Sequence, residues 1–298
     1  MRARILGSAA GGGFPQWNCH CATCEAARAG GAAQPRTQSS LAIRGADGPW
    51  FLANASPDLR QQLEALAAGP PNGVRAAPIA GVLLTDAEID HTAGLLLLRE
   101  SSTAIRVYGS DAVRSALSDG YPVLRILGRY CGVEWRSLQP GRALDIDGSS
   151  LEVESFESGG DAPRYMADAG VEVEACGLLF RDRSTGGVLA YVPGLARLDD
   201  DVLDRLGRSD AVLVDGTFWR DDELVHLGIS DRTARQMGHV PLSGPGGTLE
   251  ALSALARPRK ILVHVNNTNP VLLERSPERD AVLRAGVEVA YDGLEIEL

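Results

Sequence analysis

The residues best suited to chemistry in this chain lie in one short segment, residues 85–94, which reads TDAEIDHTAG. Asp86, Glu88 and Asp90 supply three carboxylates, and His91 supplies an imidazole directly after them. Ionised carboxylates at this spacing repel one another, and a bound divalent cation would compensate their charge. An acidic, solvated turn in which Asp90 caps the following helix is the alternative. The segment alone leaves both interpretations open.

Two further polar residues, Asp215 and His264, also follow apolar runs. The three runs are typical of buried strands: 79–84, 211–214 and 260–263. If these strands lie in one sheet, their carboxyl ends bring Asp90, His91, Asp215 and His264 to a common edge. Each residue alone could be structural, His264 as a core histidine and Asp215 as a turn cap. Together, two imidazoles and two carboxylates predict a divalent-cation site with open coordination positions.

Three of the five cysteines, Cys19, Cys21 and Cys24, lie within six residues. Three thiolates at this spacing predict a structural zinc site in a loop of about residues 11–30, with free thiols as the alternative. His20, His226 or a water molecule could complete the coordination. The remaining two cysteines, Cys131 and Cys176, have no partners at metal-binding spacing and are expected in the core.

The composition is that of a water-soluble globular protein, with 298 residues and a formal net charge of −10. The negative charge argues against nucleic-acid partners and anionic membranes. No apolar run approaches the ~20 residues of a membrane span, so no membrane insertion is expected. Glycines interrupt the apolar start of the chain, and the cysteine pattern suits a reducing compartment, which favours a cytoplasmic protein. No linker or repeat is evident, so residues 1–298 are expected to form one domain.

The expected secondary structure alternates strands and helices along the chain. Expected strands cover residues 2–6, 39–43, 50–53, 79–84, 105–108, 151–156, 171–180, 188–192, 211–214, 260–263, 287–291 and 294–298. Expected helices cover residues 57–66, 95–100, 111–117 and 277–285. The triple glycine at 11–13 lacks the continuation of a phosphate-binding loop, which excludes that form of nucleotide binding. The long polar segment of about residues 218–247 is expected to be a lid or binding loop.

The polar residues at the strand ends resemble the metallo-β-lactamase superfamily, whose signature is His-x-His-x-Asp-His followed by a late Asp and a late His. Asp90 and His91 match the end of that signature, Asp215 falls at the bridging aspartate, and His264 at the last histidine. Asp86 and Glu88 stand where the first two histidines belong, and residues 171–189 contain no third one. The resemblance implies an α/β fold, an αββα sandwich of two mixed β-sheets flanked by helices. It also implies one metal site in place of two.

A closer resemblance, to the coenzyme PQQ synthesis protein B family, spans essentially the whole chain. It is carried by five ordered motifs, at residues 11–24, 85–94, 215–219, 237–241 and 264–270. The resemblance implies a role in making pyrroloquinoline quinone (PQQ) from a peptide-derived, cross-linked Glu–Tyr unit. The implied activity is an iron- and O₂-dependent hydroxylation of the tyrosine-derived ring. A non-enzymatic carrier that moves PQQ or its precursor towards the periplasm is the alternative, and a metal-dependent hydrolase is a second.

The same resemblance suggests roles for individual residues. Fe(II), with Zn or Mn as a surrogate, would bind Asp90, His91, Asp215 and His264 and leave positions for O₂ and a phenolic oxygen. Proton transfer or hydrogen bonding to substrate falls to Asp86, Glu88 and His239. Expected contacts with the precursor, or with PQQ as product, are made by Trp219, Arg235 and Asn269, with Arg220 and Arg232 as weaker candidates. Superfamily relatives carry a zinc-ligating histidine at the position of Asn267, which is therefore an open candidate for the fourth zinc ligand. A homodimer is a further expectation.

Overall fold

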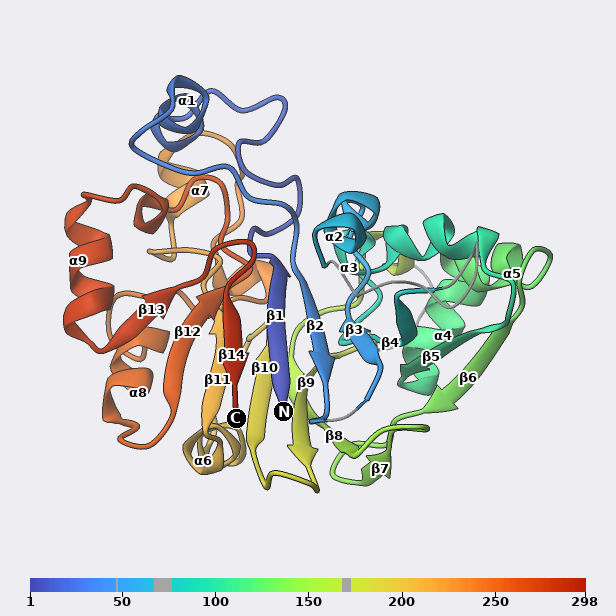
Figure 1. Cartoon of the computed structure of the whole chain (residues 1–298). Helices are drawn as coiled ribbons and strands as arrows, with labels where there is room; N and C mark the ends of the chain where they lie inside the picture. Colours follow the sequence, from blue (N-terminus) through green and yellow to red (C-terminus); the bar gives the residue numbers. More distant parts are fainter. Residues whose placement is uncertain (47, 67–76, 168–172) are drawn as a thin grey trace.

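The computed structural model describes residues 1–46, 48–66, 77–167 and 173–298. Two seven-stranded sheets pack face to face, with helices on their outer surfaces (Figure 1). The first sheet has the order β14 (Glu295–Glu297), β1 (Arg2–Gly7), β2 (Ser40–Arg44), β3 (Trp50–Ala53), β4 (Ile79–Leu83), β5 (Ile105–Gly109) and β6 (Val133–Ser137). The second has the order β13 (Val287–Val289), β12 (Arg259–Val263), β11 (Ala211–Asp215), β10 (Val188–Val192), β9 (Ala175–Asp182), β8 (Leu151–Gly159) and β7 (Ala143–Asp145).

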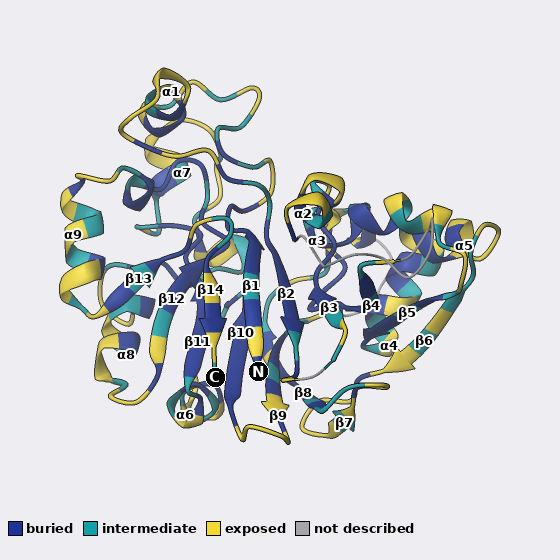
Figure 2. Ribbon diagram, viewed as in Figure 1, coloured by how far each residue is buried: buried dark blue, intermediate teal, exposed yellow. Residues whose placement is uncertain are grey.

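Both sheets are mixed. Strands β3 to β6 run parallel to one another, as do β10 to β13, whereas the pairs β1–β2, β2–β3 and β8–β9 are antiparallel. Parallel strands covered on both faces are expected to be apolar along their whole length. In strands β10 and β11 every residue is buried, and Asp215 at the end of β11 is the one charged residue among them (Figure 2).

The hydrophobic core has three layers. Between the sheets, Ile43, Phe51 and Leu83 of the first sheet pack with Phe180 and Leu213 of the second. The outer face of the first sheet is covered by α2 (Leu59–Leu66), η1 (Ala93–Glu100), α4 (Asp111–Ser115) and α5 (Val123–Leu127). The outer face of the second is covered by α6 (Asp200–Arg208), α8 (Thr248–Ala254) and α9 (Pro277–Arg284). Helix α1 (Ala22–Ala29) packs into the same hydrophobic cluster beyond the ends of the strands (Figure 1). The predicted αββα sandwich is therefore confirmed.

Most predicted strands are present, but several elements differ from the prediction. The expected strand 171–180 is β9, which begins at Ala175, and its first two expected residues lie outside the described ranges, as does the predicted break at 69–73. The run Leu95–Leu98 forms part of the 3₁₀ helix η1 and not an α-helix. Strands β6 and β7 and helices α1, α5, α6 and α8 were not predicted. Strand β6 is short and largely polar, so the apolar pattern that reveals a buried strand is missing from it.

The three strands that precede the predicted metal ligands do not share a sheet. Strand β4 belongs to the first sheet, whereas β11 and β12 are neighbours in the second. The expectation of a single common sheet edge is therefore wrong. The loops after these strands meet instead at one end of the sandwich, where both sheets contribute residues to the same cavity.

Within the described ranges, no helix is long and apolar enough to cross a membrane.

Candidate metal centre

The loop after β4 is held against the loop after β3 by contacts that only a few residue types allow. Asn54 has a left-handed backbone, with φ of 66°, which asparagine tolerates, and its side chain bonds both the backbone N–H and the hydroxyl of Thr85. A Cβ atom on Gly94 would lie 2.2 Å from the carbonyl oxygen of Ser56, so only glycine fits there. These contacts fix the start of α3 (Ile89–Thr92), the helix that carries Asp90 and His91.

His91 is buried and is oriented by Asp86. Its Nδ1 lies 2.8 Å from both carboxylate oxygens of Asp86, which also accepts hydrogen bonds from the Thr85 hydroxyl and the Glu88 backbone N–H. Burial lowers the pKa of His91, but the charges of Asp86 and Asp90 outweigh it and raise the pKa to about 9. With Nδ1 taken up by Asp86, the opposite nitrogen, Nε2, has no hydrogen-bond partner among the described residues.

Asp90 and His264 face this free nitrogen. The Oδ2 atom of Asp90 lies 3.8 Å from Nε2 of His91 and 3.3 Å from Nε2 of His264. Donor atoms that share one cation at bond lengths of roughly 2.1 Å are about 3 Å apart in a regular coordination shell. The ligand atoms of these three residues all lie within 4.8 Å of one another. An orphaned buried nitrogen with two further donors close to it fits a transition-metal ion.

Asp215, at the end of β11, forms the centre of a second group. It is fully buried and accepts four hydrogen bonds, from the backbone N–H groups of Leu195 and Thr217, the Thr217 hydroxyl and His239 Nδ1. Burial raises the pKa of Asp215, but His239 and these hydrogen bonds lower it overall, so the carboxylate is ionised. Ligand atoms of Asp215, His239 and His264 also lie within 4.8 Å of one another.

A cavity of about 340 Å³ opens beside these two groups. The described residues that line it include four acidic residues and three histidines but no lysine or arginine: Asp86, Glu88, Asp90, Asp161, His91, His239 and His264. A larger cavity of about 600 Å³ at the opposite ends of β4 and β5 has no histidine or cysteine in its described lining. The chemistry therefore lies in the smaller cavity, where the excess of acidic groups favours a bound cation.

Comparisons with known proteins place the chain in a family. Residues 49–265 match the model of the β-lactamase superfamily domain. Coenzyme PQQ synthesis protein B of Cupriavidus necator is 50% identical over 99% of both chains. The protein of the same name from Methylococcus capsulatus is 47% identical over the full length of both chains.

The chain belongs to the coenzyme PQQ synthesis protein B family.

A solved structure supports this assignment. The zinc-bound member of this family from Methylobacterium extorquens matches the whole chain with a TM-score of 0.90 and 38% sequence identity. The resemblance drawn from the five sequence motifs is thus confirmed at the level of the family and of the metallo-β-lactamase fold.

The structure brings the predicted ligands together as two overlapping groups, and not as one set of four. Asp90, His91 and His264 form the first, and Asp215 shares His264 with the second. His239, predicted to transfer protons, lies inside the second group and lines the cavity, with its ring stacked 5.6 Å from that of His264. Asp215 was predicted to bind the metal ion. In this structure it already accepts four hydrogen bonds, so its contacts are those of a carboxylate that orients neighbouring side chains such as His239.

The two acidic residues predicted to contact substrate have different positions. Asp86 is buried beneath His91, with both oxygens engaged by the imidazole, so its contacts are those of an orienting group. Glu88 is exposed at the cavity. Partial loss of hydration there, together with the charges of Asp86 and Asp90, raises the pKa of Glu88 to about 7.

The three predicted substrate-binding residues do not line the cavity as it is described. Asn269 is fully buried, and its amide bonds the backbone of residues 216, 217 and 271. Trp219 packs with the hydrophobic layer on the outer face of the second sheet. The guanidinium of Arg235 approaches the carbonyl oxygen of Gly246. Of the weaker candidates, Arg220 bonds Asp222, and Arg232 lies 3.8 Å from Asp161 at the cavity.

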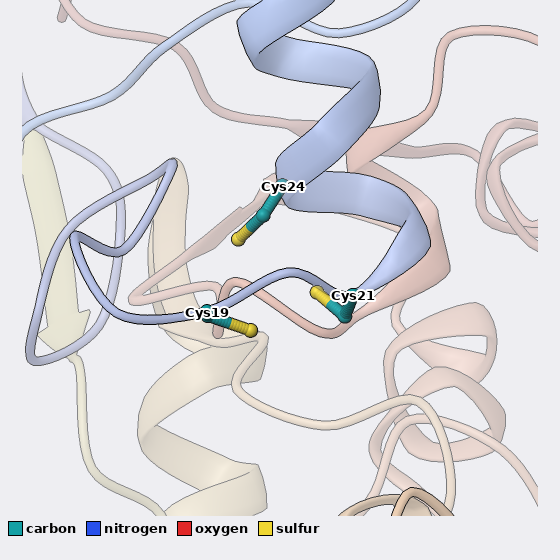
Figure 3. A group of neighbouring side chains, drawn as sticks. All are labelled: Cys19, Cys21 and Cys24. Carbon is teal, nitrogen blue, oxygen red and sulfur yellow. The ribbon is translucent and has the colours of Figure 1, made fainter.

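The cysteine cluster is a separate site. The sulfur atoms of Cys19, Cys21 and Cys24 lie within 4.8 Å of one another and point towards a common centre (Figure 3). Cys21 directly precedes α1, and Cys24 lies in the first turn of that helix. Arg28 donates to the carbonyl oxygens of Gln16 and Cys19 and so holds the loop closed. Three sulfur donors at these separations fit a tetrahedral zinc ion.

Asn267 faces this cluster directly. Its side-chain amide nitrogen lies 3.3 Å from the sulfur of Cys24, and its backbone carbonyl accepts a hydrogen bond from Thr23. By contrast, His20 turns to Glu25 and its side chain is 78% exposed. The described group of donors contains the three cysteines alone, without His20 or His226. Of the three candidate protein ligands, His20, His226 and Asn267, it is Asn267 whose side chain lies beside the cysteine sulfurs.

Thr217 is a residue of the site that the sequence analysis did not single out. Its hydroxyl lies 2.5 Å from Oδ1 of Asp215 and 2.8 Å from Nδ1 of His264. The spacing Asp-x-Thr after a strand is a signal that was available, because an aspartate commonly bonds the backbone two residues ahead of it. That signal predicts the turn after β11. It does not predict the contact with His264, because His264 follows the neighbouring strand, β12.

Proposed function

We propose that this protein is a non-haem iron enzyme of PQQ biosynthesis, which uses O₂ to hydroxylate the tyrosine-derived ring of a cross-linked Glu–Tyr precursor. The observation that carries the proposal is the convergence of Asp90, His91 and His264 on one side of an open cavity. Two histidines and one carboxylate are the donor set of many Fe(II) oxygenases. The names of the full-length relatives support the pathway.

Fe(II) in this donor set would supply O₂ activation, which no side chain provides. Three protein donors leave other positions for small ligands and for a phenolic or catechol oxygen of the substrate. Asp86 would hold the His91 ring with Nε2 turned towards the ion, as carboxylates do behind metal-bound histidines.

Two groups at the cavity can move protons. His239 is paired with Asp215 through Nδ1, which leaves its Nε2 available to donate or accept a proton. Burial lowers the pKa of His239, but the charge of Asp215 raises it overall, so the ring carries a proton more readily than a free histidine. Glu88, with its pKa of about 7, is the second candidate to take a proton from a ring hydroxyl.

The reaction needs electrons as well as O₂. Hydroxylation of a ring C–H places one oxygen atom in the product and reduces the other to water, which consumes two electrons and two protons. A catechol-type substrate or an added two-electron reductant can supply them. We therefore propose a phenol- or diol-containing precursor, presented with its ring inside the acidic cavity and its carboxylates directed outwards. We propose that Arg232, whose guanidinium lies 3.8 Å from the Asp161 carboxylate at the cavity, pairs with them.

The test is O₂ consumption by anaerobically purified, Fe(II)-loaded protein given a Glu–Tyr-derived diol and ascorbate, with the product analysed by mass spectrometry. Turnover that adds one oxygen atom, and is abolished in Asp90→Asn and His264→Ala, supports the proposal. Asp119→Asn, which changes an exposed aspartate near α5, serves as the control and should retain full turnover.

Two other results would redirect the assignment. Tight stoichiometric binding of PQQ, with no turnover under any aerobic condition, would identify a carrier. Hydrolysis of an ester or phosphodiester that rises with Zn²⁺ or Mn²⁺ in the absence of O₂ would identify a hydrolase.

A further inference from the structure

Thr217 lies at a junction between the two groups of candidate ligands. It follows β11, and its side chain is buried next to His264, the residue that the two groups share. Its hydroxyl lies 2.5 Å from Asp215 Oδ1, 2.8 Å from His264 Nδ1 and 2.9 Å from the His264 carbonyl oxygen. One hydroxyl therefore contacts a carboxylate, an imidazole and the backbone that carries this imidazole.

The hydroxyl has a single hydrogen, and the distances decide where it lies. Two oxygen atoms 2.5 Å apart repel unless a hydrogen lies between them, so Thr217 donates to the ionised Asp215 carboxylate. The Thr217 oxygen must then act as acceptor for the nearby Nδ1 of His264. His264 therefore carries its hydrogen on Nδ1, which leaves the lone pair of Nε2 directed towards Asp90, 3.3 Å away.

The backbone of His264 is unusual as well. His264 has a left-handed conformation with φ of 54°, which a residue with a side chain rarely adopts unless its surroundings impose it. Because the single hydrogen of the Thr217 hydroxyl goes to Asp215, the hydroxyl holds His264 through its ring nitrogen and not through its carbonyl oxygen. Removal of the hydroxyl would therefore release the ring.

We propose that Thr217 is a positioning residue that fixes the Nδ1–H tautomer of His264 and so presents Nε2 to the metal ion. Asp215 then orients two histidines, His239 by direct contact and His264 through the Thr217 hydroxyl. The inference rests on the metal site of the proposed function, but it requires only that a divalent cation binds His264. It does not require oxygen chemistry.

The test uses Thr217→Val, which keeps the shape and removes the hydroxyl, and Thr217→Ser, which restores it. Thr248→Val is the matched control, because Thr248 is also buried, and among the described residues its hydroxyl bonds the carbonyl oxygen of Val240 and no metal-site residue. Mn²⁺ binding is followed by electron paramagnetic resonance, with zinc already in the cysteine cluster. We expect Thr217→Val to weaken Mn²⁺ binding about 10- to 100-fold, the usual loss when such a supporting contact is removed. Thr217→Ser should recover most of it, and Thr248→Val should match the wild type.

A second readout reports the tautomer of His264 directly and does not depend on metal affinity. In protein with ¹⁵N-labelled histidine at mildly alkaline pH, the His264 signal, assigned by its loss in His264→Gln, should be that of the Nδ1–H tautomer. In Thr217→Val it should become a mixture. An Nε2–H tautomer in the wild type, or Mn²⁺ affinity in Thr217→Val equal to that of the wild type, would overturn the inference. Loss of Mn²⁺ affinity in a protein that never consumes O₂ would leave the inference intact and reject the oxygenase.

Discussion

Both carboxylate oxygens of Asp86 lie 2.8 Å from Nδ1 of His91, within a buried pair. This contact uses the nitrogen that faces away from the cavity and leaves the other one free to bind a cation. The sequence suggested that Asp86 contacts substrate, and the structure gives it a different set of contacts. The two roles can be tested separately. A residue that orients a metal-binding histidine should affect metal affinity, whereas a residue that contacts the substrate should affect turnover.

Replacement of Asp86 by Asn should weaken binding of Mn²⁺ or Fe(II) about 10- to 100-fold, because a neutral amide orients the His91 ring less strongly than a carboxylate. Isothermal titration of the metal-free protein measures the change. Glu88→Gln, which removes a carboxylate exposed at the cavity, is the matched control and should change the affinity much less. Equal losses in both variants would show that overall charge matters and ring orientation does not.

Metal binding should become tighter as the pH rises. The charges of Asp86 and Asp90 overcome the effect of burial and raise the pKa of His91 to about 9, so His91 of the metal-free protein is protonated at neutral pH. A cation at Nε2 must displace that proton, which costs about tenfold in affinity per pH unit below about 9. The raised pKa also stabilises the metal-free fold below pH 6.5, and this contribution is lost as the pH rises through about 9. An affinity that stays constant between pH 7 and 9 would contradict the assignment.

His239→Gln should separate proton transfer from metal binding. If His239 moves protons, turnover falls about 10²- to 10⁴-fold while Mn²⁺ affinity stays close to that of the wild type. Steady-state kinetics and metal titration of the same preparation give both numbers. A collapse of affinity would instead make His239 a ligand, as its place in the second group of donors also allows.

The cysteine cluster should be a structural zinc site. Cys24→Ser removes the most buried of the three sulfurs, and we expect the loss of one equivalent of zinc and a fall in melting temperature of more than about 5 °C. Cys131→Ser changes a partly buried cysteine far from the cluster in the sequence and should leave the zinc content unchanged. Elemental analysis and calorimetry measure both effects. Unaltered zinc content in Cys24→Ser would rule out the site.

Asn267→His should convert the cluster into a site with four strong donors. The amide nitrogen of Asn267 lies 3.3 Å from the sulfur of Cys24, so an imidazole at this position starts beside the sulfurs. We expect zinc affinity to rise at least about tenfold, because imidazole is a better zinc ligand than a carboxamide. Competition with a chromogenic chelator measures it. A fall in affinity would indicate that the Asn267 side chain already binds the metal or orders the loop around it.

Much of the sandwich could be predicted because its inner strands contain continuous apolar runs, as in 188–192 and 211–214. Strand β6 was not predicted because it lies at a sheet edge and is largely polar. Helix α6 was not predicted either. Asp199 was an available signal for its start, because its side chain accepts a hydrogen bond from the Val202 backbone N–H, as a typical helix N-cap does.

The candidate site could be predicted only as a set of residue types. A sequence shows that Asp86 and Asp90 are near His91, but not which carboxylate faces Nδ1 and which faces Nε2. That choice depends on the rotamer of His91 within the packed loop after β4. The contact between Thr217 and His264 depends on the pairing of β11 with β12, which places residues 47 apart in the chain next to each other.

The division of the donors between β4 of one sheet and β12 of the other has a consequence for folding. An ion held by Asp90, His91 and His264 is a crosslink between the two layers of the sandwich, and it can form only after both layers have assembled. Its binding energy therefore adds to the cohesion of the whole fold, by an amount set by the ratio of free metal to the dissociation constant. Depletion of that metal in the cell would then lower the abundance of the protein as well as its activity.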